Sequence, residues 1–157
     1  MEEKIRKIKV GDAAPDFTLK DQDGNDFRLL ARKGKRVLLS FHPLAWTAVC
    51  TKQMQSLENN YQMFESLNTV PAGLSVDPVP SKKAWAEHLG IKKVPLLSDF
   101  WPHGEVARLY DIFREKNGFS ERANILIDEK GEIALFKTYP VSQLPDINEI
   151  IEAIRKL

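Results

Sequence analysis

Cysteine is scarce in this sequence, since Cys50 is the only one among 157 residues. A single thiol excludes a disulfide within the chain, and it excludes zinc sites built on paired cysteines. The histidines His42, His88 and His103 stand far apart and lack metal-ligand spacing such as His-Glu-x-x-His. We therefore find no metal motif.

An excess of charge of one sign and long apolar runs are also missing. The 23 Lys and Arg residues against 22 Asp and Glu residues give a formal charge of +1, which argues against a nucleic-acid surface or a polybasic membrane patch. No apolar run approaches the roughly 18 residues of a membrane span. The segment from Met1 to Val10 lacks the apolar core of a signal peptide. We expect a soluble cytoplasmic protein that binds neither nucleic acid nor membrane.

What is present suffices for an ordinary folded core. The length falls within the roughly 100 to 200 residues typical of one domain. With 43% apolar and 29% charged residues, the composition gives no sign of disorder. We predict a single domain over residues 1–157, without a linker, an internal repeat or a low-complexity tract.

A central strand followed by a helix is the clearest local pattern. Residues 37–41 form a near-continuous apolar run, which is typical of a strand covered on both faces. Helical spacing begins at Ala48 and places Cys50 in the first turn. Thr47 before the helix and Gln53 three residues after Cys50 suggest a loose capping box. The apolar residues at helical spacing are Met54, Leu57, Tyr61 and Phe64.

Other strands and helices alternate along the chain. In order, we predict a hairpin of residues 17–20 and 26–30, a second apolar run at 70–76 interrupted by Pro71 and Gly73, a helix at 81–89 and a short strand at Leu96 and Leu97. A helix at 105–110, a hairpin of 123–128 and 133–137 and a final helix follow. Pro145 helps to start the final helix, and its apolar face consists of Ile147, Ile150, Ile151, Ile154 and Leu157. This alternation indicates an α/β layered domain with a mixed sheet.

The surroundings of Cys50 favour a nucleophilic thiolate. Backbone N–H groups at a helix N-terminus and the helix dipole stabilise an anionic sulfur. The hydroxyl of Thr47 can donate and accept, so it can orient both the sulfur and an oxygen atom of an incoming molecule. Pro43 and Trp46 can shield the pocket from water, and Pro43 has no N–H to leave unpaired.

The string Pro43-Leu44-Ala45-Trp46-Thr47-Ala48-Val49-Cys50 resembles the Pro-x-x-x-Thr-x-x-Cys signature of the peroxiredoxins, thioredoxin-fold peroxidases of the AhpC/TSA (alkyl hydroperoxide reductase) family. Val10-Gly11-Asp12-x-Ala14-Pro15-x-Phe17-x-Leu19 resembles the opening of that family. Arg122 matches the position of the active-site arginine, whose fork of donors can bind sulfur and peroxide together. Residues 43–47 and 95–104 look most like the one-cysteine AhpE-type group.

The resemblance implies a thioredoxin-like three-layer domain, with a central mixed β-sheet flanked by helices. It implies a thiol-dependent peroxidase for hydrogen peroxide and small organic hydroperoxides, with Cys50, Thr47, Arg122 and Pro43 as catalytic residues. Cys50 would become a sulfenic acid, which an external thiol reduces: a low-molecular-weight thiol, or a thioredoxin-like or glutaredoxin-like protein. No bound cofactor is needed, and a homodimer or higher homo-oligomer is expected.

The sequence departs from the family pattern at three points. A resolving cysteine is absent, which excludes a disulfide with a second thiol of the same chain or of an identical chain. Gln53 stands where many members carry Glu, so a charge is lost while hydrogen bonding remains possible. His42 replaces a commoner aromatic residue before Pro43. Whether His42 touches the sulfur is left open.

Simpler readings exist for each residue taken alone. A lone cysteine is often inert and buried, Thr47 can be a helix cap, Pro43 a loop residue and Arg122 half of a surface ion pair. His42 and His103 suit polar packing or the surface rather than acid–base chemistry. The three tryptophans suit the core or subunit contacts, and residues 100–102 suit self-association. The alternative function is a peroxide-responsive redox sensor or binding module without efficient turnover. A disulfide reductase is disfavoured because no Cys-x-x-Cys pair exists.

Overall fold

The computed structural model describes residues 7–157. The expectation that the segment from Met1 to Val10 is no signal peptide falls mainly on residues outside that part of the chain. Within the described part, no helix has the length and apolar character needed to cross a bilayer.

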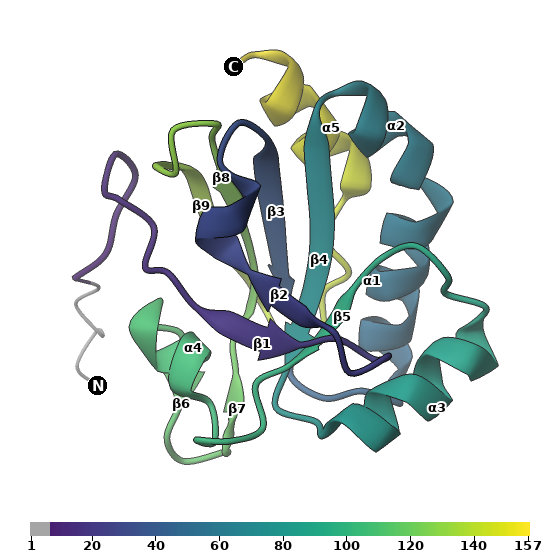
Figure 1. Ribbon diagram of the computed structural model, residues 1–157. Helices are drawn as coiled ribbons and strands as arrows, with labels where there is room; N and C mark the ends of the chain where they lie inside the picture. The colour runs from purple at the N-terminus through teal and green to yellow at the C-terminus, as the bar shows by residue number, and fades with distance from the viewer. Residues whose placement is uncertain (1–6) are drawn as a thin grey trace.

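A seven-stranded mixed sheet, in the order β2-β1-β5-β4-β3-β8-β9, forms the centre of the fold (Figure 1). β3 (Arg36–Phe41) lies between β4 (Thr69–Ser75), to which it is parallel, and β8 (Arg122–Ile127), to which it is antiparallel. β5 (Leu96–Ser98) continues the sheet parallel to β4, and β9 (Ile133–Tyr139) pairs antiparallel with β8. The predicted central strand and late hairpin are therefore confirmed.

The predicted first hairpin is also confirmed, although it is shorter than expected. It consists of β1 (Thr18–Lys20) and β2 (Asp26–Arg28), and the chain then enters a 3-10 helix, η1 (Leu29–Arg32). A second, separate pair of strands, β6 (Phe113–Arg114) and β7 (Phe119–Ser120), was not predicted. Strands of two residues are too short to show an alternating pattern.

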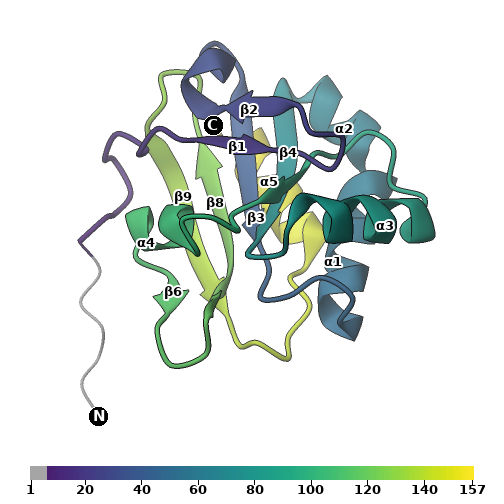
Figure 2. The same ribbon diagram turned by 60° about the horizontal axis from the view of Figure 1, so that its bottom comes forward.

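Helices cover both faces of the sheet, which confirms the three-layer arrangement. Figures 1 and 2 place the short helix α4 (Glu105–Leu109) across the sheet from α1 and α5. The remaining helices are α1 (Ala48–Asn59), α2 (Tyr61–Ser66), α3 (Val79–Leu89) and α5 (Ile147–Arg155). They share one buried apolar cluster, whereas α4 contributes to the other.

The division of the core follows from alternation along the strands. Along β3, Leu39 and Phe41 belong to the cluster on the α4 side, and Leu38 belongs to the cluster under α1 and α5. Along β8, Ile125 belongs to the first cluster and Leu126 to the second. Successive side chains of a strand point to opposite faces, so each of these strands supports two cores.

The chain between β3 and β4 differs from the prediction of one continuous helix. α1 ends at Asn59, Asn60 leaves the helical conformation with φ −106° and ψ 13°, and α2 begins directly after it. The prediction of a capping box at the start of α1 is wrong as well. Thr47 is the N-cap of α1, but its side chain makes no capping hydrogen bond, and Gln53 turns inward to Ser40 instead.

The last helix has a different start from the predicted one. Asp146, rather than Pro145, is the N-cap of α5, and its carboxylate accepts a hydrogen bond of 2.9 Å from the N–H of Asn148. A side-chain acceptor at this position satisfies one of the free N–H groups of the first turn. Pro145 therefore only precedes the cap.

The apolar run with a proline and a glycine is a genuine inner strand. Pro71 of β4 pairs with Leu38 of β3, but β5 pairs with β4 only from Gly73 onward. Pro71 thus has a neighbouring strand on the β3 side only. Because no strand pairs with it on the β5 side, the missing N–H of the proline leaves no hydrogen bond unmade there. A Cβ at Gly73 would overlap Met54 of α1, so this glycine lets the helix lie close to the sheet.

Candidate active site

Cys50 lies at the junction between the central strand and the first long helix. β3 ends at Phe41, the chain turns through residues 42–47, and Cys50 is the third residue of α1. Its thiol is free and its side chain is fully buried, with 0% exposure. The strand therefore brings the sulfur to the start of a helix, where unpaired N–H groups favour negative charge.

Arg122 is the group that the structure places against the sulfur. Its Nη1 donates to the Cys50 Sγ at 3.3 Å and to the Gln53 Oε1 at 2.6 Å. Gln53 in turn donates from Nε2 to the Ser40 hydroxyl at 2.7 Å. The amide that stands in place of a carboxylate therefore links the guanidinium to the central strand without adding a charge.

The guanidinium is held from its other side as well. The Nε and Nη2 atoms of Arg122 donate to the carbonyl of Val141, at 3.0 and 2.7 Å. Arg122 is 2% exposed and begins β8, where alternation with Ala123 turns its side chain toward the layer of α1. The reading of Arg122 as a surface residue is therefore wrong.

Thr47 and Pro43 line the hollow beside this centre. The Thr47 hydroxyl donates to the carbonyl of Leu44 at 2.7 Å, and no hydrogen bond within residues 7–157 joins it to Cys50. Pro43 is buried, whereas Trp46 is 51% exposed and adopts φ +71°. The hydroxyl of Thr47 keeps its lone pairs free to accept a hydrogen bond from an incoming molecule.

The turn that presents these residues is fixed by one carboxylate. Asp77, which follows β4, accepts a hydrogen bond from the N–H of Ala45 at 2.8 Å and from the Ser75 hydroxyl at 2.6 Å. Its own carbonyl accepts from Ser98 at 2.7 Å. The ends of three neighbouring strands therefore position the turn, and no signal in the sequence pointed to Asp77.

A hollow of about 260 Å³ lies beside the buried sulfur, bounded by Val49 and Arg122, and Cys50 itself does not line it. One water needs only about 10 to 15 Å³ of such a cavity, so a peroxide fits. Arg122 lines the hollow and also contacts the sulfur, so it connects the opening to the thiol. The lining residues are Pro43, Leu44, Thr47, Ala48, Val49, Phe119, Arg122 and Val141.

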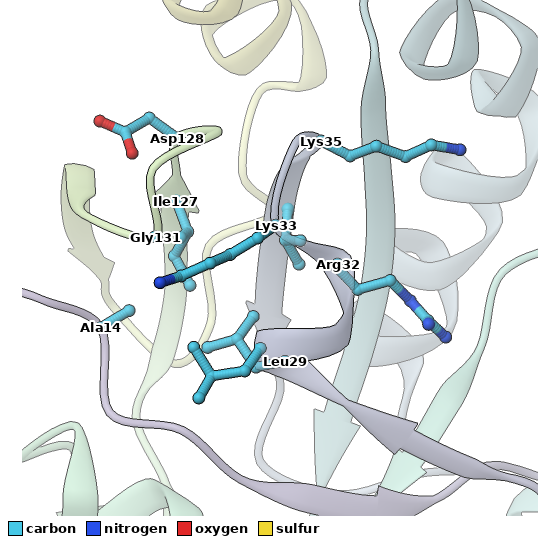
Figure 3. A pocket seen from close by; sticks show the side chains of 10 residues that line it. Ala14, Leu29, Arg32, Lys33, Lys35, Ile127, Asp128 and Gly131 are labelled. Carbon is cyan, nitrogen blue, oxygen red and sulfur yellow. The ribbon is translucent and has the colours of Figure 1, made fainter.

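Another hollow, beside η1, offers none of this chemistry. Figure 3 shows Lys33 reaching across it between Leu29 and Gly131, with Asp128 above. It contains no thiol and only about 10 Å³ of accessible space. Within residues 7–157, no group of three His, Cys, Asp or Glu side chains is placed to hold a metal ion.

A second buried polar pair lies near the sulfur. The Nζ of Lys82, on α3, is 3.0 Å from the Nε2 of His42, and both side chains have 0% exposure. Burial lowers the pKa of Lys82 to about 7, although the negative charges of Asp77, Cys50 and Asp99 oppose the shift. Burial, together with the positive charges of Lys82 and Arg122, lowers the pKa of His42 well below its usual value.

The sequence contained a signal for this pair that was not used. Lys82 stands three and four residues before Trp85 and Ala86, which form the buried face of α3, so helical spacing places a lysine among core residues. His42 follows the central strand directly. Its reading as polar packing is confirmed, and its reading as a surface residue is wrong.

The remaining aromatic and histidine candidates lie outside this centre. His103 is half-buried, with its Nε2 2.7 Å from the carbonyl of Gly118. Trp85 is fully buried, whereas Trp101 is 81% exposed and Phe100 is 47% exposed. The tryptophans therefore divide into one core residue and two on the surface, Trp46 and Trp101.

Comparison with known proteins gives consistent similarities. The model of the AhpC/TSA family matches residues 10–136. Alkyl hydroperoxide reductase E of Mycobacterium tuberculosis is 41% identical over 127 residues, which are 80% of this chain and 82% of that protein. Peroxiredoxin 2 of Thermoplasma acidophilum is 36% identical over 153 residues, 94% of this chain and 75% of the relative.

The fold is similar to solved structures as well. The crystal structure of reduced Plasmodium vivax 2-Cys peroxiredoxin superposes with a TM-score of 0.85 at 28% identity, over 93% of this chain and 80% of that chain. This similarity extends to the sheet and its helices, whereas the single cysteine here sets this chain apart from a two-cysteine chemistry.

Proposed function

Since this chain belongs to the AhpC/TSA family and is a peroxiredoxin enzyme, we propose that Cys50, Arg122, Thr47 and Pro43 form its catalytic centre. The observation that carries the proposal is the 3.3 Å contact between Arg122 Nη1 and Cys50 Sγ. The same guanidinium lines the hollow beside the sulfur, where a peroxide has room to enter.

In the first step, the Cys50 thiolate attacks one oxygen of the peroxide. A sulfur–oxygen bond forms and the oxygen–oxygen bond breaks, so that the sulfur is oxidised to a sulfenic acid and the peroxide is reduced. The leaving oxygen takes a proton from the solvent and departs as water or as an alcohol. Arg122 stabilises the charge that develops on that oxygen, and Thr47 accepts a hydrogen bond from the peroxide and orients it.

Pro43 contributes by closing one wall of the hollow. Its ring is buried and brings no N–H that would need a partner. A wall without donors limits water near the sulfur, and charge interactions become stronger where water is excluded. Arg122 is enclosed by protein on the side of Gln53 and faces the hollow on its other side.

The oxidised enzyme is restored by thiols from outside the chain. One thiol attacks the sulfenic sulfur, water leaves, and a mixed disulfide forms with Cys50. A second thiol then attacks that disulfide and releases the reduced enzyme. The reductant is a low-molecular-weight thiol or a thioredoxin-like or glutaredoxin-like protein, and sulfinic acid forms when such thiols are scarce.

Stopped-flow mixing of the reduced protein with hydrogen peroxide tests the centre. Replacing Cys50 by Ser should abolish turnover, and replacing Arg122 by Ala should cost about 3 kcal/mol of transition-state stabilisation, roughly a hundredfold in rate. Arg28→Ala, which removes a 57% exposed side chain paired with Asp16 on an edge strand, is the matched control. A wild-type rate in the Arg122 variant would remove this residue from the centre.

Steady-state peroxide consumption with a panel of thiols separates the enzyme from a redox sensor. An enzyme consumes many equivalents of peroxide for each Cys50, whereas a sensor reacts once and stops. Mass spectrometry of Cys50 after one equivalent of peroxide, and again after each thiol, identifies the sulfenic acid and the reductant together.

We also propose that residues 1–157 act as one domain, in the cytoplasm, as a homodimer or higher homo-oligomer. Strands from both halves of the described chain belong to one sheet, which supports the single domain. The exposed rings of Phe100 and Trp101 support a self-association surface. Light scattering of the wild type and of Trp101→Arg measures the oligomer, and an unchanged mass in the variant would exclude this surface.

A further inference from the structure

Lys82 is a buried cation whose only hydrogen-bond partner within the described residues is a histidine. Its Nζ lies 3.0 Å from His42 Nε2 and 5.7 Å from the centre of the Trp85 ring. No carboxylate of residues 7–157 lies within ion-pair distance of it. A fully buried ammonium without a carboxylate partner is costly, so its presence calls for a compensating interaction.

The charged groups that act on this ammonium belong to the reaction centre and its supports. Asp77 fixes the turn before α1, Asp99 caps α4 through the N–H groups of Val106 and Ala107, and Cys50 is the nucleophile. Each of the three, when negative, favours a positive Lys82. By the same interaction, a positive Lys82 favours a negative Cys50.

His42 fixes the position of the Lys82 ammonium through a hydrogen bond. Because the pKa of His42 is far below its usual value, the imidazole stays neutral, and its Nε2 accepts from Lys82. The ring proton then resides on Nδ1, which is buried, and the backbone of Ser40 lies close enough to this imidazole to favour its protonation, although burial outweighs that effect. The ring also stacks at 5.4 Å on Trp85, whose Nε1 donates to Thr51, the residue after Cys50.

We propose that Lys82 is a positioning residue for the peroxidase reaction. Its ammonium, which neutral His42 holds, is a second buried positive charge that stabilises the Cys50 thiolate in addition to Arg122. This inference rests on the proposed function of Cys50. It assigns a role to two residues that do not belong to the proposed catalytic centre.

The proposal has a consequence for pH that Arg122 alone does not produce. A guanidinium keeps its charge at every accessible pH, whereas the pKa of Lys82, lowered by burial to about 7, lets this charge disappear in mildly alkaline solution. The contribution of Lys82 is therefore complete below about pH 6 and lost above about pH 8. His42, already neutral, does not titrate in this window.

Stopped-flow rates with hydrogen peroxide from pH 5 to pH 9 test the role of Lys82. At pH 6, Lys82→Met should react about tenfold more slowly and show less thiolate absorbance near 240 nm, because one stabilising charge is missing. At pH 9 the variant and the wild type should differ by less than twofold. Lys83→Met, which removes the exposed neighbouring lysine of α3, should follow the wild type throughout.

Lys82→Arg provides a second, independent measurement in case the methionine variant does not fold. It keeps a positive charge at alkaline pH, so its rate should exceed that of the wild type at pH 9 relative to pH 6. Identical pH profiles for the wild type, Lys82→Arg and Lys83→Met would overturn the proposal. A wild type no faster than free cysteine would instead refute the proposed function, so the two failures are distinguishable.

Discussion

Replacing Lys82 by Met should stabilise the folded protein at low pH, by an amount that declines as the pH rises. In the unfolded chain the lysine has its ordinary pKa of 10.5, and burial lowers the pKa to about 7 in the folded protein. Below pH 7 both states bind the proton, and the folded state bears the whole cost of the buried charge. The difference of about 3.5 pKa units corresponds to a cost on the order of 5 kcal/mol.

The sign of the pH dependence follows from proton counting. Between pH 7 and 10.5 the unfolded state binds more protons at this site than the folded state, so the stability of the wild type rises by about 1.4 kcal/mol per pH unit relative to the variant. At pH 7 the folded-state lysine is half protonated, so the slope is not yet complete there, and from pH 7 to pH 9 the advantage of Lys82→Met should shrink by about 2 kcal/mol. The long, unbranched methionine fills nearly the same volume, which limits the cavity effect.

Urea unfolding followed by tryptophan fluorescence, at pH 6, 7, 8 and 9, measures this difference. Lys83→Met is again the control, because its side chain is exposed and should give a difference that does not depend on pH. A constant difference between Lys82→Met and the wild type across this range would mean that Lys82 keeps its proton in the folded state. The account of the buried ammonium would then be refuted.

Three further changes test other parts of the structure. Gln53→Ala removes one of the two acceptors of Arg122 Nη1 and should lower the rate with peroxide about tenfold, measured by stopped flow, because the guanidinium is less firmly held. An unchanged rate would show that the bonds to Val141 suffice to hold the guanidinium. Asp146→Ala should cost about 1 kcal/mol in urea unfolding without a change in rate. Gly104→Ala should lower the free energy of unfolding by about 2 kcal/mol or more, because φ is +70° and the new Cβ would overlap the Phe113 ring. An unchanged melting temperature would contradict this prediction.

Most of the fold was predictable because its strands and helices show clear periods. The apolar run in β3, the hairpin of β8 and β9 and the stripe of α5 each repeat over several residues. The break at Asn60 was not predictable, since the helical spacing of apolar residues continues across it. The two-residue strands β6 and β7 give no pattern at all.

The candidate site was predictable in composition and less so in geometry. Cys50, Thr47 and Arg122 were named from spacing and resemblance, but spacing gives no side-chain direction. Spacing therefore did not reveal that the hydroxyl of Thr47 donates to the carbonyl of Leu44 rather than to the sulfur. It also did not reveal that Gln53 accepts a hydrogen bond from Arg122 instead of capping the helix. Asp77 remained unnoticed because its hydrogen bonds join segments that are distant in the sequence.

The pairing of β8 with β3 restricts which insertions and deletions the enzyme can tolerate. Phe41 lies opposite Ala123 and Val37 opposite Ile127, so Arg122 sits just beyond the paired stretch with its side chain in the layer of α1. Removal of one residue within β8 would exchange the two faces of the strand and send the guanidinium into the wrong core. Length changes are harmless only at turns away from the hollow, which rules out the turn between β6 and β7, because Phe119 at the start of β7 lines the hollow.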